Sequence, residues 1–142
     1  MLNYKTGVVG AGRVGAGMAT LMAGHGCSVT IIGLDEDDLK RCRGILEGNL
    51  DELVQQGLAT EKNRAAILKR FTLSTDTADL KDCMFVLEAA FENLDVKKGI
   101  YKQVEAVDAP DTLMASTTSA ISVELLTADT EHPGRFAVTH PF

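Results

Sequence analysis

The stretch Gly7-Val8-Val9-Gly10-Ala11-Gly12-Arg13-Val14-Gly15 decides the fold of this chain. A short apolar run leads directly into a glycine loop, and an alanine-rich run of helical character follows the loop. In such a loop the first glycine allows a sharp turn out of a strand, the second lets backbone approach a pyrophosphate, and the third lets a helix pack closely on the sheet. The pattern therefore predicts a strand, a phosphate-binding turn and a helix.

The ligand that this turn favours is a dinucleotide. Unpaired N–H groups and the positive end of the helix dipole attract phosphate, so no basic side chain is needed. A second strand-like run at residues 27–32 supports the assignment, because a glycine loop alone is a weak signal. We expect the dinucleotide to be bound by six residues of the loop: Gly10, Ala11, Gly12, Arg13, Val14 and Gly15.

Composition places the chain among single-domain proteins and disfavours several functions. The 142 residues are 45% hydrophobic and 24% charged, with no apolar run long enough to cross a membrane. A net charge of −6 disfavours a nucleic-acid partner. The three cysteines lack CxxC spacing, so we predict small core residues and no metal site. The N-terminal residues lead into a strand without a signal pattern, and we expect a cytoplasmic protein.

Strand patterns and helix patterns alternate along the whole chain. This alternation predicts an α/β fold of the Rossmann type, with a doubly wound parallel sheet in a single domain, residues 1–142. Predicted strands lie at residues 7–9, 27–32, 71–74, 83–87, 112–115 and 135–139, and predicted helices at 14–23, 35–57, 60–68, 94–107 and 123–126. Gly57 is predicted to end the second of these helices, and Thr60 to cap the third. On the helix at 94–107 we expect an apolar face formed by Val96, Ile100, Tyr101 and Val104.

Polar residues follow several of the predicted strands. Because ligands bind beyond the carboxyl ends of parallel strands, the candidates for chemistry are Glu88, Glu92, the hydroxyl cluster Ser116-Thr117-Thr118-Ser119, and His140. Three of these residues also have a structural interpretation. Glu92 suits the start of the following helix, Ser119 suits a helix cap, and His140 suits a strand end.

Five segments together resemble the NAD-binding domain of the 3-hydroxyacyl-CoA dehydrogenases: residues 7–17, 75–80, 87–98 (LEAAFENLDVKK), 117–119 and His140. The resemblance implies NAD as cofactor and a 3-hydroxyacyl-CoA as substrate. It implies that His140 is the catalytic acid/base, and that Ser119 hydrogen-bonds the reacting oxygen. Glu92, Lys97 and Ser119 are expected on the cofactor side of the site. An imidazole suits this role, because histidine changes its charge near neutral pH.

The resemblance also implies a larger protein. Members continue into a helical domain that closes the substrate site, forms most of a homodimer interface and supplies an acidic partner to the histidine. We therefore expect residues 1–142 to bind the cofactor and to catalyse poorly alone.

Two departures from the family pattern concern the cofactor and the catalytic loop. Gly33 stands where the family has an acid that binds the adenosine ribose, and Asp35 is either its substitute or a helix cap. Loss of the acid also opens the alternative of NADP, with Lys40, Arg41 or Arg43 nearby, although we expect NAD. Thr117 replaces the usual asparagine.

A third departure concerns the substrate. Pro141 after His140 is similar to the carnitine and gulonate dehydrogenase branch, and Asn49, Gln55 and Gln56 stand where a CoA-binding lysine is expected. Two alternatives thus accompany the main prediction. One is a dehydrogenase for a small 3-hydroxy acid without CoA, and the other is a dinucleotide-binding module without catalysis.

Overall fold

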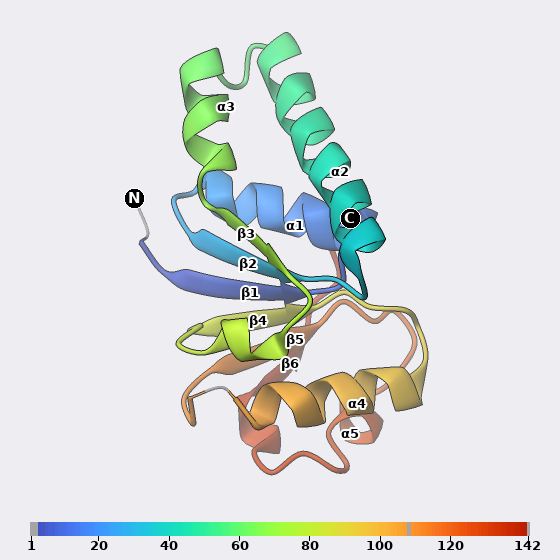
Figure 1. Cartoon of the computed structure of the whole chain (residues 1–142). Coiled ribbons are helices and arrows are strands. Elements are labelled where there is room, and N and C mark those ends of the chain that lie inside the picture. Colours follow the sequence, from blue (N-terminus) through green and yellow to red (C-terminus); the bar gives the residue numbers. More distant parts are fainter. Residues whose placement is uncertain (1–2, 108, 142) are drawn as a thin grey trace.

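A computed structural model describes residues 3–107 and 109–141 of the chain. Its six strands form one parallel sheet in the order β3-β2-β1-β4-β5-β6, which confirms the predicted doubly wound fold (Figure 1). The strands are β1 Lys5–Val9, β2 Ser28–Ile32, β3 Phe71–Ser74, β4 Phe85–Glu88, β5 Leu113–Ser116 and β6 Phe136–Val138. The helices are α1 Arg13–Gly24, α2 Glu36–Gln55, α3 Glu61–Leu68, α4 Leu94–Glu105 and α5 Val123–Leu126, with 3-10 turns at Thr77–Leu80 and Pro133–Arg135.

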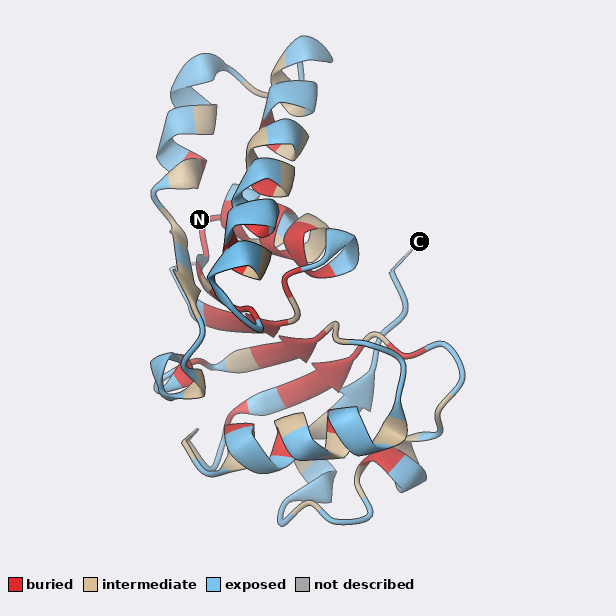
Figure 2. Ribbon diagram, turned by 45° about the vertical axis from the view of Figure 1, so that its right-hand side comes forward, coloured by how far each residue is buried: buried red, intermediate tan, exposed pale blue. Residues whose placement is uncertain are grey.

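The helices cover the two faces of the sheet. In Figure 1, α1 and α2 lie on one side and α4 and α5 on the other, while the far end of the α2–α3 hairpin extends away from the sheet. Two apolar clusters fill these layers. Val8, Ile31 and Leu46 belong to the first, and Tyr101 and Leu126 to the second. Figure 2 shows the central strands buried and the hairpin mostly exposed, so the sheet is the rigid platform for the loops at its edge.

Short polar side chains begin most of the helices, as the sequence predicts for two of them. Asp35 accepts a hydrogen bond from the Asp38 N–H (2.7 Å) at the start of α2, which confirms the capping interpretation of Asp35. Thr60 and Asn63 form a reciprocal capping box at α3. Gly57 has a φ of +72° just beyond α2, where it ends the helix as expected.

Two details of the predicted elements are wrong. Strand β4 begins at Phe85 rather than residue 83, and Met84 is 55% exposed. On α4, Val96 is 45% exposed, whereas Lys97 is fully buried with Tyr101 and Val104. The helix therefore turns Lys97 inward in place of Val96, because the buried carboxylate of Glu88 pairs with the Lys97 ammonium.

The cysteines and two of the histidines lie where the sequence predicts them. Cys27, Cys42 and Cys83 are buried and free, and burial raises the pKa of the Cys42 and Cys83 thiols to about 11. His25 and His132 are exposed. Within residues 3–107 and 109–141, no helix is long and apolar enough to span a bilayer.

Candidate cofactor and catalytic site

The glycine loop connects β1 to α1 at the carboxyl edge of the sheet. The Gly10 N–H donates to the Ile32 carbonyl (2.9 Å), so the loop is joined to the end of β2. Gly10 has a φ of +118°, and a Cβ there would stand 2.4 Å from the Ala89 carbonyl oxygen. A Cβ on Gly15 would stand 1.9 Å from the Gly10 oxygen. The first and third glycines are therefore required by the backbone itself.

The second glycine, Gly12, has a different environment. Apart from its chain neighbours, no described heavy atom lies within 4 Å of the position of a Cβ on Gly12. It is also the N-cap of α1, where it provides no side-chain cap, whereas Asp35, Thr60 and Asn93 cap α2, α3 and α4. Open space in front of a helix start without a side-chain cap fits a bound pyrophosphate.

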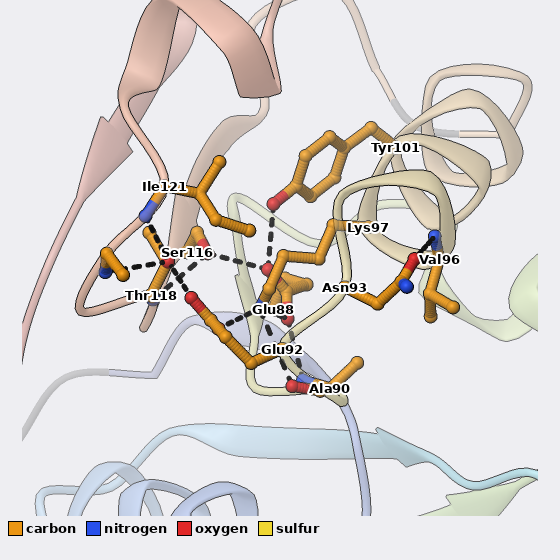
Figure 3. Close-up of polar contacts among 11 residues, drawn as sticks. Glu88, Ala90, Glu92, Asn93, Val96, Lys97, Tyr101, Ser116, Thr118 and Ile121 are labelled. Atoms are coloured by element: carbon orange, nitrogen blue, oxygen red, sulfur yellow. Dashed lines mark hydrogen bonds and ion pairs between the residues drawn. The ribbon is translucent and has the colours of Figure 1, made fainter.

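A buried carboxylate organises the neighbouring part of the edge (Figure 3). Glu88, the last residue of β4, is 1% exposed. It accepts four hydrogen bonds: from Lys97 Nζ (2.8 Å), Tyr101 Oη (2.7 Å), Ser116 Oγ (2.6 Å) and the Ala90 N–H (2.6 Å). Burial raises the pKa of Tyr101 well above its usual value, so its hydroxyl stays a donor. The network joins β4, α4 and β5.

Lys97 extends this network to Glu92, which lies in the loop between β4 and α4. Its Nζ lies 3.2 Å from Glu92 Oε2, and Thr118 Oγ1 donates to the other oxygen of Glu92. Partial burial favours protonation of Glu92, but the bonds from Thr118 and Lys97 outweigh it and hold the pKa of Glu92 below its usual value. Glu92 is thus a fixed anion whose side chain is 43% exposed at the edge of the sheet.

Ser119 and His140 lie on the loops that follow β5 and β6. Both residues are exposed. The Thr139 N–H donates to the Ser116 carbonyl (2.8 Å), so the segment that carries His140 is joined to the end of β5. The Thr117 N–H in turn donates to the Glu88 carbonyl (2.9 Å). Backbone hydrogen bonds therefore bring the ends of three strands to one edge.

The predicted site residues thus follow adjacent strands of the sheet. The glycine loop follows β1, Glu92 follows β4, Ser119 follows β5 and His140 follows β6. Of the candidates, Glu88 and Glu92 are both in direct contact with Lys97. Lys97 was expected on the cofactor side of the site, and the structure shows its ammonium fully buried between two carboxylates.

The sequence marks Ser116 and Thr118 only as part of a hydroxyl cluster, and Tyr101 only as part of an apolar helix face. It does not predict that the three side chains donate hydrogen bonds to Glu88 and Glu92. The spacing of residues on α4 does contain a signal for the inward position of Lys97. Lys97, Tyr101 and Val104 recur at i, i+4 and i+7, which places all three on one face of α4. The partners Ser116 and Thr118 carry no comparable signal, because their contacts depend on the pairing of β4 with β5.

Comparison with known proteins settles which dinucleotide-binding domain this is. Residues 5–142 match the family described as "3-hydroxyacyl-CoA dehydrogenase, NAD binding domain". The chain belongs to this family. The family assignment, and NAD as its cofactor, agree with the resemblance seen in the sequence.

Individual relatives support the same assignment. The chain is 37% identical over 136 residues to a 3-hydroxybutyryl-CoA dehydrogenase of Bradyrhizobium diazoefficiens, covering 96% of this chain and 46% of that protein. It is 35% identical to a 3-hydroxyadipyl-CoA dehydrogenase of Escherichia coli, covering 100% of this chain and 30% of that one. The structure of (S)-3-hydroxybutyryl-CoA dehydrogenase from Ralstonia eutropha superposes with a TM-score of 0.94 at 34% identity, covering 99% of this chain and 50% of that chain. The chain thus spans at most about half of these relatives.

Proposed function

We propose that this domain binds NAD in an enzyme that oxidises the C3 hydroxyl of a 3-hydroxyacyl-CoA. One observation carries the proposal: the glycine loop, Glu92, Ser119 and His140 all follow adjacent strands at one edge of the sheet. The relatives are 3-hydroxyacyl-CoA dehydrogenases by name, which favours a CoA thioester over a free hydroxy acid.

The proposed chemistry separates a hydride from a proton. NAD, when bound, supplies the acceptor for the hydride that leaves C3. The His140 imidazole takes the hydroxyl proton, since loss of hydride alone would leave a protonated carbonyl. Ser119 Oγ hydrogen-bonds the same oxygen and orients it toward the base. In the reverse direction His140 returns the proton to the carbonyl oxygen.

The cofactor contacts follow from the geometry of the loop. The backbone of residues 10–15 and the start of α1 would hold the pyrophosphate. The anionic Glu92, fixed by Lys97 and Thr118, would lie beside the cofactor. We propose that Lys97 acts through Glu92, because its ammonium is buried.

The rest of the protein belongs to the same proposal. A helical domain would close the substrate site, orient the imidazole of His140 and form a homodimer. The share of the relatives that this chain covers, 46% and 50%, leaves room for such a domain. The three free thiols fit a reducing compartment such as the cytoplasm.

The test is a pair of histidine variants in the complete protein. His140→Ala should lower kcat for reduction of acetoacetyl-CoA by NADH about 100-fold or more, with the Kd for NADH nearly unchanged. His132→Ala, a change of an exposed histidine outside the site, serves as the control and should keep full activity. Equal loss of turnover and NADH binding in His140→Ala would show that His140 has a structural role instead.

The assay run in the opposite direction, with NAD and a 3-hydroxy substrate, separates the two alternatives. Turnover of free 3-hydroxybutyrate but not its CoA thioester would favour a small hydroxy acid as substrate. NADH binding without turnover of either compound would favour a binding module without catalysis.

A further inference from the structure

The end of β2 lacks an acidic side chain where a dinucleotide would place its adenosine ribose. Val9 of β1 pairs with Ile32 of β2, and the Gly10 N–H donates to Ile32, so Gly33 lies beside the glycine loop. In domains of this type a carboxylate near the end of the second strand binds the ribose hydroxyls and selects NAD over NADP. Gly33 has no side chain to do so.

A side chain at position 33 would also have to displace neighbouring side chains of α2. A Cβ there would stand 2.6 Å from Leu39 Cδ2 and 3.1 Å from Asp38 Oδ2. Leu39 is 6% exposed and part of the core. Space that an acid at residue 33 would need is therefore taken up by the first turn of α2.

A carboxylate nevertheless lies at this point, and it belongs to Asp38. Asp38 Oδ2 accepts the Leu34 N–H (3.0 Å), and Oδ1 pairs with Arg41 Nη2 (3.2 Å), so the group is held in place from both sides. Its side chain is 17% exposed. Asp35, the other candidate, uses its carboxylate to cap α2.

We propose that Asp38, in the first turn of α2, replaces the acid of residue 33 as the acceptor for the adenosine ribose hydroxyls. The same carboxylate disfavours NADP, because a 2′-phosphate would stand against a negative charge. It also holds Arg41, the side chain that would otherwise be available to that phosphate. The inference rests on the NAD-binding part of the proposed function.

Calorimetric titration of the chain with NADH and NADPH tests the inference without any assay of activity. Asp38→Asn should weaken NADH binding roughly tenfold, the size of one hydrogen bond to a charged group, and should narrow the preference for NADH over NADPH. Asp37→Asn, the same change at an exposed position of the same turn, is the matched control and should leave both affinities unchanged. Thermal unfolding of each variant checks that α2 remains folded.

Two results would overturn the inference, and they are distinguishable. If Asp38→Asn binds both nucleotides as Asp37→Asn does, the role of Asp38 is wrong while NAD binding stands. If the unsubstituted chain binds neither nucleotide, the NAD-binding assignment fails, and the role of Asp38 fails with it.

Discussion

The two halves of the sheet edge are built by different means. At the ends of β1 and β2, the structure uses backbone: glycines that bring N–H groups and a helix start into open space. At the ends of β4 and β5, it uses side chains: a buried carboxylate, an ammonium and hydroxyls. A site made of backbone needs small residues at fixed spacing, whereas a site made of side chains needs partners from several elements. An added Cβ at Gly10 or Gly15 would disrupt the first, and loss of the charge on Glu88 would disrupt the second.

The largest expected effect concerns the half of the edge that is built from backbone, at the ends of β1 and β2. Gly15→Ala should lower the free energy of unfolding by about 3 kcal/mol or more, because the added Cβ meets the Gly10 carbonyl at 1.9 Å and neither backbone can yield easily. Gly12→Ala is the matched control, since its Cβ would meet open space. Gly12→Ala should unfold at the same temperature as the unsubstituted chain. It should nevertheless bind NADH more weakly, because its methyl group would occupy the open space in front of α1. Thermal unfolding and NADH titration check both variants, and equal destabilisation by the two would contradict the distinction.

The next effect concerns the half of the edge that is built from side chains, at the ends of β4 and β5. Glu88→Gln should cost about 3 kcal/mol, because it removes the charge that faces the fully buried Lys97. Glu92→Gln, which contacts the same ammonium from a side chain that is 43% exposed, should cost less than about 1 kcal/mol. Urea denaturation measures both. The claim that Glu88 is the centre of the network fails if Glu92→Gln is as costly as Glu88→Gln.

The smallest effect is a pH dependence within the side-chain half. The pKa of Glu92 is lower in the folded chain than its usual value, so the charged form contributes stability above the unfolded pKa. That contribution is lost as the pH falls through the folded pKa. In unfolding curves, the unsubstituted chain should have a slightly higher free energy of unfolding than Glu92→Gln at neutral pH. This difference should disappear as the pH is lowered to about pH 3. A constant difference across this range would mean that Glu92 is not held as an anion.

Most of the fold follows from the sequence, because it depends on local patterns. The glycine loop, the caps Asp35 and Thr60, and the stop at Gly57 are each recognisable from a few adjacent residues, and the alternation of elements gives the parallel sheet. The sequence predicts the ends of the strands less accurately than their presence. Met84 is apolar like the strand that it precedes, yet it is exposed, and no local pattern distinguishes it.

The candidate site follows from the sequence only in part. The glycine loop carries its own geometry, so its residues could be named. The inward position of Lys97 depends on Glu88, and the position of Glu88 depends on Ser116, twenty-eight residues away on the neighbouring strand. A single sequence does not specify which strands are neighbours. For this reason the sequence places Lys97 on the cofactor side of the site but does not predict its burial against Glu88.

The contact of Lys97 with both Glu88 and Glu92 also limits how this domain can be re-engineered. Segment 88–101 carries Glu88, Glu92 and Lys97 together with one hydroxyl donor, Tyr101. The other two hydroxyl donors, Ser116 and Thr118, lie outside it. A chimaera that receives this segment from a relative would gain both carboxylates without assured donors on β5 and its loop. Segments 88–101 and 116–118 should therefore be exchanged together. Redesign of substrate or cofactor preference in this domain should transfer both segments from the same relative.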